Sequence, residues 1–72
     1  MKKHDFMVKY NYWLKRYYKA VDYFNDLSVD DNEKLKYLDT FNTVVEEVSM
    51  LIKEFQPLFG REMTYKEIEE GF

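Results

Sequence analysis

The sequence predicts an all-α fold: an antiparallel two-helix hairpin followed by a short C-terminal helix, which completes a helical bundle by self-association or by binding a partner. Two observations carry this prediction. Apolar residues recur at alternating spacings of four and three along two long segments, and this spacing places them on one face of a helix. No segment shows the strict apolar–polar alternation of a half-buried strand. With 72 residues the chain is long enough for one domain, which we expect over residues 1–72.

The first helix is predicted at about residues 5–27. Asp5 is the expected N-cap, and no Gly or Pro interrupts the segment. A heptad seam of apolar residues runs along it: Phe6, Tyr10, Trp13, Tyr17, Ala20, Phe24 and Leu27.

The second helix is predicted at about residues 30–56. Ser28 or Asp30 is the expected N-cap, and the acidic residues that follow suit the positive end of the helix dipole. Pro57 should end or kink the helix because it lacks an N–H, and Gly60 provides a stop. The seam of this helix consists of Leu38, Phe41, Val45, Val48, Ile52, Phe55 and Phe59.

A short third helix is predicted at about residues 65–70. Thr64 and Glu67 have the spacing of a capping box, and Gly71 stands where a C-cap belongs. So short a helix is not stable by itself, so Ile68 and Phe72 should dock on the hairpin.

The apolar stripes of the two long helices are wider than a single partner helix can cover. We therefore expect several of Tyr10, Trp13, Leu14, Tyr17, Phe41 and Phe55 to stay exposed in one chain. A second copy or another protein would then cover them. The residues predicted to form the core or a self-association surface are Phe6, Tyr10, Trp13, Leu14, Tyr17, Phe24, Leu38, Phe41, Val45, Val48, Ile52 and Phe55.

The two long segments carry opposite charge. The net charge of the chain is -3, but residues 1–27 carry a balance of +3 and residues 28–56 a balance of -4. This division favours an antiparallel hairpin and would orient a dimer, although each exposed ion pair contributes only about 0–1 kcal/mol.

A basic and aromatic face is predicted on the first helix, opposite the seam. It consists of Lys9, Tyr12, Lys15, Arg16, Lys19 and Tyr23. Such a face can anchor a protein interface, bind bases and phosphates of a nucleic acid, or remain solvated. The acidic total charge and a pI near 5.1 count against nucleic acid.

Catalytic residue patterns are absent from the sequence. His4 is the only histidine, there is no cysteine, and neither a Gly-rich phosphate loop nor a zinc ligand pattern occurs. Glu46 and Glu47 lack the histidine that a di-iron motif needs three residues later. We therefore expect no enzymatic activity, no metal ion and no cofactor.

These patterns favour a small non-enzymatic protein–protein interaction module, a regulator or inhibitor that acts by occupying a surface. The alternatives are a nucleic-acid-binding protein that uses the basic and aromatic face, and a structural subunit of a larger assembly. We expect a homodimer or another protein as partner, and no membrane or small-molecule substrate. A cytoplasmic location is predicted because charged residues interrupt any apolar run at the start. The composition, rich in Lys, Asn, Tyr, Phe and Ile, is typical of AT-rich genomes such as those of bacteria and their phages.

Overall fold

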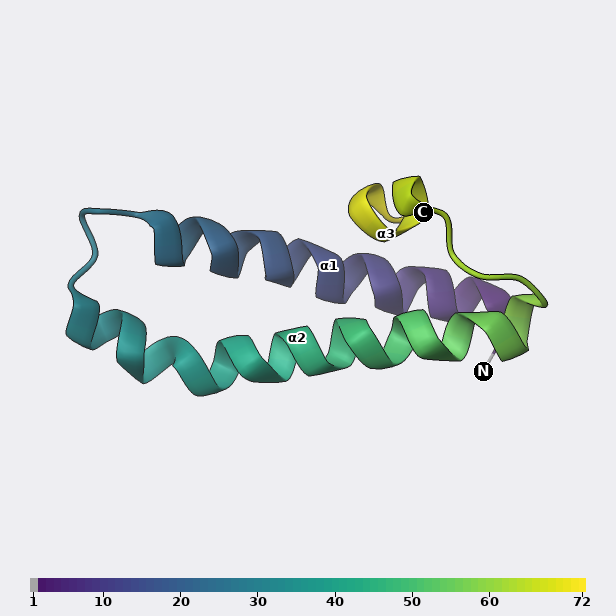
Figure 1. Cartoon of the computed structure of the whole chain (residues 1–72), viewed down its shortest axis with the longest axis horizontal. Helices are drawn as coiled ribbons and strands as arrows, with labels where there is room; N and C mark the ends of the chain where they lie inside the picture. The colour runs from purple at the N-terminus through teal and green to yellow at the C-terminus, as the bar shows by residue number, and fades with distance from the viewer. Residues whose placement is uncertain (1) are drawn as a thin grey trace.

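The computed structural model describes residues 2–72, which form three helices (Figure 1). Helix α1 spans Lys3–Asn25, α2 spans Asp31–Phe59 and α3 spans Tyr65–Glu70. Helices α1 and α2 run antiparallel along the long axis, and α3 folds back beside α1, between its middle and the end that carries the N-terminus. No strand occurs among residues 2–72. The predicted all-α class, with two long helices and a short third one, is confirmed.

Helix α1 begins and ends two residues earlier than predicted. Asp5, the expected N-cap, lies in the first turn, and Lys2 occupies the cap position without a side-chain hydrogen bond. The helix ends early because the Asp26 carboxylate accepts hydrogen bonds from the Ser28 N–H (2.9 Å) and hydroxyl (2.7 Å). This local turn competes with further helix. Leu27, assigned to the seam by its spacing, is therefore 97% exposed in the connection, and that assignment is wrong.

Helix α2 begins after Asp30, whose carboxylate accepts a hydrogen bond from the Asn32 N–H (3.1 Å). Pro57 was expected to end or kink this helix, and it does not end it, because α2 continues through Pro57 to Phe59. A proline inside a helix removes one hydrogen bond and crowds the carbonyl four residues before it, and the packing of Leu58 and Phe59 against the core offsets this cost. Gly60 ends the helix in a left-handed conformation, with φ 75° and ψ 15°.

Helix α3 has the predicted capping box. The Glu67 N–H donates to the Thr64 hydroxyl (3.1 Å), and the Thr64 N–H donates to the Glu67 carboxylate (2.9 Å). Arg61 adds two hydrogen bonds to the same carboxylate, at 2.8 and 2.9 Å. The Arg61 guanidinium and the Thr64 N–H together lower the pKa of Glu67 to about 2. This carboxylate therefore ties the connection after α2 to the start of α3.

Side chains of α1 bind the far end of α3 through its backbone. The Tyr10 hydroxyl donates to the Ile68 carbonyl (2.8 Å), and the Tyr18 hydroxyl donates to the Glu69 carbonyl. The Asn11 amide pairs with both backbone groups of Phe72, at 2.8 and 2.7 Å. These contacts satisfy carbonyls that the end of so short a helix leaves without partners. They hold α3 and Phe72 against α1 between Tyr10 and Tyr18.

The core lies at the end of the hairpin that α3 covers. Its buried members are Phe6, Tyr10, Leu14, Leu51 and Phe55, while Ala20 and Val44 are buried outside this cluster, each at 1% exposure. The ring of Phe72 lies 5.8 Å from that of Tyr10 and 6.0 Å from that of Phe55, between centroids. Of the six residues among which we expected several to stay exposed, Tyr10, Leu14 and Phe55 are buried, at 0%, 6% and 0% exposure, and the structure corrects the expectation there. Helix α3 and Phe72 supply the cover that a two-helix estimate lacked.

The other half of the hairpin is covered less completely. Trp13, Tyr17 and Phe41, the other residues expected to be exposed, are partly buried. The ring of Phe24 lies tilted at 5.0 Å from that of Phe41, and Tyr17 stacks on the same ring at 6.2 Å, between centroids. Leu38, at 41% exposure, reaches solvent. None of the helices within residues 2–72 has both the length and the apolar character to cross a lipid bilayer.

Candidate interaction surfaces

The predicted basic and aromatic face is largely accessible on α1. Lys9, Lys15 and Lys19 are exposed, and Tyr12 is 53% exposed. Arg16 is partly buried because its guanidinium lies against neighbouring rings. These five side chains project from one continuous helix, so regular helical geometry positions them.

Tyr23 does not belong to this face. Its ring lies 5.0 Å from that of Tyr37 on α2 and 5.8 Å from that of Phe24, and the side chain is partly buried. The prediction that Tyr23 points away from the apolar seam is therefore wrong. A tyrosine ring on the flank of a helix is long enough to lean onto the neighbouring helix, and Tyr37 gives it an aromatic partner there.

Three side chains of α1 form a contact cluster on this face. The Arg16 guanidinium donates a hydrogen bond to the Tyr12 hydroxyl (2.9 Å) and lies 5.6 Å from the centre of that ring. It also lies 5.4 Å from the ring of Trp13, which meets Tyr12 edge-on at 5.3 Å. The i, i+4 and i, i+3 spacings bring Arg16 to the two rings. We call these residues the Tyr12–Trp13–Arg16 cluster. The sequence placed Trp13 only in the seam, although its spacing to Arg16 was a signal for the cluster.

The cations of α1 have no carboxylate partner in the part of the chain that the structure describes. The ion pairs found within residues 2–72 are Lys36–Glu33 (3.3 Å) and Arg61–Glu67 (2.8 Å). Lys9, Lys15, Arg16 and Lys19 therefore present positive charge around the Tyr12–Trp13–Arg16 cluster without neutralisation by a direct ion pair. A surface of this kind attracts acidic groups, more strongly at low salt.

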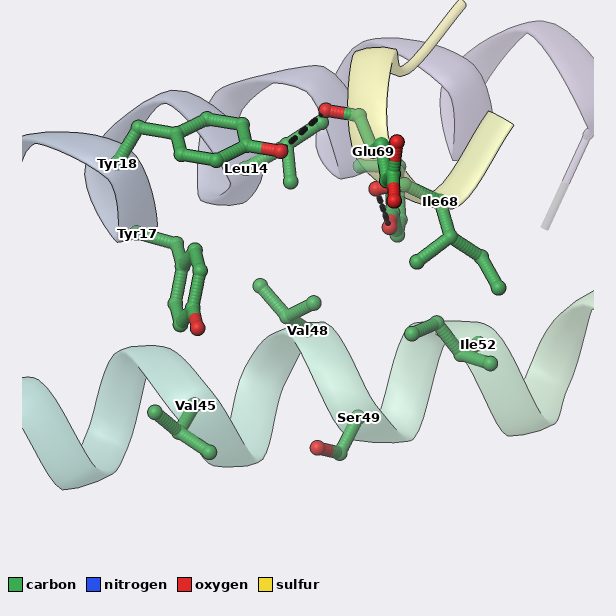
Figure 2. A pocket seen from close by; sticks show the side chains of 10 residues that line it. Leu14, Tyr17, Tyr18, Val45, Val48, Ser49, Ile52, Ile68 and Glu69 are labelled. Carbon is green, nitrogen blue, oxygen red and sulfur yellow. Dashed lines mark hydrogen bonds between the residues drawn. The ribbon is translucent and has the colours of Figure 1, made fainter. Parts of the chain in front are cut away.

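A second surface, an apolar cavity of about 440 Å³, opens between α1, α2 and α3 (Figure 2). Val48 and Ile52 of α2 face Tyr17 and Leu14 of α1 across it in Figure 2, and Val45 also lines it. Ile68 and Glu69 of α3 form its wall, where the Tyr18 hydroxyl donates to the Glu69 carbonyl. The cavity lies at the border of the part of the hairpin that α3 covers. Its lining is mainly apolar, and this suits an apolar group more than an ion.

The titratable groups do not gather into a centre for chemistry. Among residues 2–72, no three His, Cys, Asp or Glu side chains are arranged to hold a metal ion. His4 is exposed in the first turn of α1. Burial, with a smaller contribution from Tyr18, raises the pKa of Tyr10 to about 12, and its hydroxyl is engaged with the Ile68 carbonyl. The arrangement offers surfaces for contact.

The remaining predicted seam residues divide between the core and its margins. Phe6 and Phe55 are buried together, with ring centroids 5.6 Å apart. The side chains that remain partly buried are Trp13, Tyr17, Phe24, Phe41, Val45, Val48 and Ile52. Comparison of this chain with protein-family models, with curated proteins and with solved structures gives no match.

Proposed function

We propose that this chain is a small non-enzymatic protein–protein interaction module that regulates or inhibits another protein by occupying part of its surface. The observation that carries this proposal is the Tyr12–Trp13–Arg16 cluster, which lies on an exposed helix face among lysines without ion-pair partners. Tyr, Trp and Arg are the residue types that contribute most binding energy in protein interfaces.

The geometry of the cluster supports a binding role. The Tyr12 hydroxyl and two rings already fix the Arg16 guanidinium, so little side-chain freedom is lost when a partner binds. A partner carboxylate could reach the remaining N–H groups of Arg16, and Lys9, Lys15 and Lys19 would attract an acidic partner from a distance.

The partly covered half of the hairpin supports the same proposal. Tyr17, Phe24 and Phe41 keep part of their surface in water, and Leu38 is 41% exposed. Each large apolar side chain gains about 1.5–3 kcal/mol when it is fully buried. Completion of a helical bundle, by a second copy or by another protein, would supply this stabilisation.

Affinity capture from the native host tests the module. The wild-type chain is compared with the double variant Tyr12→Ala/Arg16→Ala and with a matched control, Tyr65→Ala/Lys66→Ala. The control residues are exposed and lie on α3, outside the cluster. We expect a protein that the wild type and the control retain and that the cluster variant loses, while circular dichroism shows equal helix content. Equal retention by all three chains would show that the binding face is wrong.

Nucleic acid is the second candidate ligand, favoured by the exposed Tyr12 ring among unpaired cations on one helix face. A gel-shift series between about 50 and 200 mM salt separates the two functions. Binding that falls steeply with salt supports nucleic acid. Absent binding at the lower salt concentration removes it.

A further inference from the structure

The two sides of the hairpin differ in what they carry. Helix α3 and the cavity of about 440 Å³ mark one side, and that cavity is lined by Tyr10, Leu14 and Tyr18 of α1 and by Val45, Ser49 and Ile52 of α2. With 100° between successive residues of a helix, a different set faces the opposite side. That set is Lys9, Tyr12, Arg16 and Lys19 on α1, and Glu47, Met50 and Glu54 on α2. We call this surface the bipolar side.

Charge on the bipolar side is divided between its two edges. The α1 edge carries Lys9, Arg16 and Lys19, with Asp5 near its start. The α2 edge carries Glu47 and Glu54, with Lys36, which is paired with Glu33, near its start. No ion pair joins the two edges within residues 2–72, where the pairs found are Lys36–Glu33 and Arg61–Glu67. The attraction of each edge for the opposite charge is therefore available to a partner. A surface with one basic and one acidic edge is complementary to a rotated copy of itself.

We infer that the bipolar side binds a second copy of this chain, in a two-fold four-helix bundle whose symmetry axis runs parallel to α1 and α2. This inference rests on the proposed function, because it uses the same binding face, which a second copy occupies when no other protein is bound. Rotation about such an axis exchanges the two edges, so α1 of each copy faces α2 of the other. A two-fold axis in the plane of the interface but perpendicular to the helices would instead set α1 on α1, with like charges opposed. The parallel axis also makes all four neighbouring helix pairs antiparallel.

The register of the hairpin sets the contacts between copies. Within the chain Phe6 is level with Phe55 and Tyr23 with Tyr37, at centroid distances of 5.6 and 5.0 Å. Rotation about an axis parallel to the helices preserves height, so the same levels meet across the interface. Lys9 then lies opposite the partner's Glu54, and Arg16 lies opposite the partner's Glu47. Both attractive contacts occur twice in the dimer.

An apolar contact lies between these charged pairs. Tyr12 is level with the partner's Met50, and in the single chain the two residues are 53% and 52% exposed. A methionine sulfur beside an aromatic ring is a favourable contact, and both side chains leave water in the dimer. The Cα extents of the chain are 44, 20 and 16 Å, so a broad side matches the area of about 800 Å² per partner in a stable interface.

Charge-swapped chains test this arrangement by sedimentation equilibrium at about 50 mM salt, where exposed charges are weakly screened. The acidic variant is Lys9→Glu/Arg16→Glu, and the basic variant is Glu47→Lys/Glu54→Lys. Each variant alone opposes like charges at four places in the dimer. We expect each to dimerise at least about tenfold more weakly than the wild type. An equal mixture restores attraction at all four places, so we expect a heterodimer as tight as the wild-type dimer.

Matched controls carry the same changes of net charge on other surfaces. Lys53→Glu/Lys66→Glu and Glu62→Lys/Glu70→Lys alter exposed residues outside the bipolar side, and each should dimerise like the wild type. Circular dichroism of every chain checks that the helices form. Rescue on mixing reports contacts between copies, because charge repulsion within one chain is not relieved by adding another chain.

The outcomes separate this inference from the proposed function. A wild-type chain that sediments as one copy at every concentration overturns the dimer, as do charge-swapped variants that dimerise normally or controls that weaken equally. The proposed function still stands in those cases if capture of another protein depends on Tyr12 and Arg16. The proposed function alone fails if the dimer forms as described and no captured protein depends on Tyr12 and Arg16.

Discussion

The two halves of the hairpin differ in burial although apolar stripes run through both. At the end covered by α3, Phe6, Tyr10 and Phe55 are 0% exposed. Towards the connection between α1 and α2, Tyr17, Phe24 and Phe41 are only partly buried, and Leu38 and Leu35 are 41% and 67% exposed. A helix of six residues and one phenylalanine ring account for this difference. The comparison shows that two helices bury such stripes incompletely and that a third layer completes the burial.

The largest effect should come from the covered half. Phe55→Ala removes a fully buried ring that stacks on Phe59 at 4.1 Å. We expect the free energy of unfolding to fall by about 3–5 kcal/mol, which would leave so small a chain largely unfolded. Urea titration followed by circular dichroism measures it. The matched change Phe41→Ala, in the partly covered half, should cost roughly half as much. Equal losses of unfolding free energy in the two variants would show that the two halves of the hairpin do not differ in burial.

The attachment of α3 should be the next most sensitive feature. Gly71 has φ 77° and ψ −154°, and a Cβ at this position would overlap with the Asn11 side-chain oxygen. We expect Gly71→Ala to cost about 1–3 kcal/mol and to release Phe72 from the core. Hydrogen exchange of the α3 amides measures the release. Gly60→Ala, where a Cβ meets open space, should cost about 1 kcal/mol through its positive φ alone and leave α3 protected.

Acid should loosen α3 before the rest of the core. The pKa of Glu67 is lowered to about 2 in the folded chain, first by the Arg61 guanidinium and then by the Thr64 N–H. Because the folded pKa lies below the ordinary value of 4.5, this stabilisation is present above pH 4.5 and is lost as the pH falls towards 2. The melting temperatures of wild type and Glu67→Gln should therefore converge between pH 5 and 2. A constant difference between the two melting temperatures over that range would show that the Glu67 carboxylate does not stabilise the fold.

The smallest effect on stability should come from the exposed cluster. Tyr12→Ala should change the unfolding free energy of the dilute monomer by no more than about 0.5 kcal/mol, because the ring is 53% exposed. Its dimerisation and partner binding should nevertheless weaken. Urea titration at high dilution, beside sedimentation at high concentration, separates the two effects. A large loss of monomer stability would make Tyr12 a core residue instead.

The helices could be predicted from the sequence because their signals are local. Seam spacing, the Asp30 cap, the Thr64–Glu67 capping box and Gly60 each act within a few residues, and the structure contains all of them. Pro57 misled the prediction because its effect depends on packing beyond it: Phe59 holds the last turn against the core.

The surfaces were harder to predict because they depend on contacts distant in sequence. The burial of Tyr10 follows from Phe72 and from the Ile68 carbonyl, 58 positions away. The position of Tyr23 follows from Tyr37, which only the folded hairpin brings near. Helical periodicity placed Lys9, Tyr12, Lys15 and Lys19 on an exposed face, and they are exposed. It could not show that the Trp13 ring meets Arg16 there.

Trp13 gives the most direct test that the bipolar side is covered by a second chain. It is the only tryptophan, is partly buried, and lies beside Tyr12 at the edge of that side. Acrylamide quenching of its fluorescence can be followed while the wild-type chain is diluted and its mass is recorded by light scattering. The account predicts a shielded indole at high concentration that becomes accessible as the mass falls from two copies to one. An indole equally shielded at every dilution, in a chain that is always a single folded copy, would contradict it.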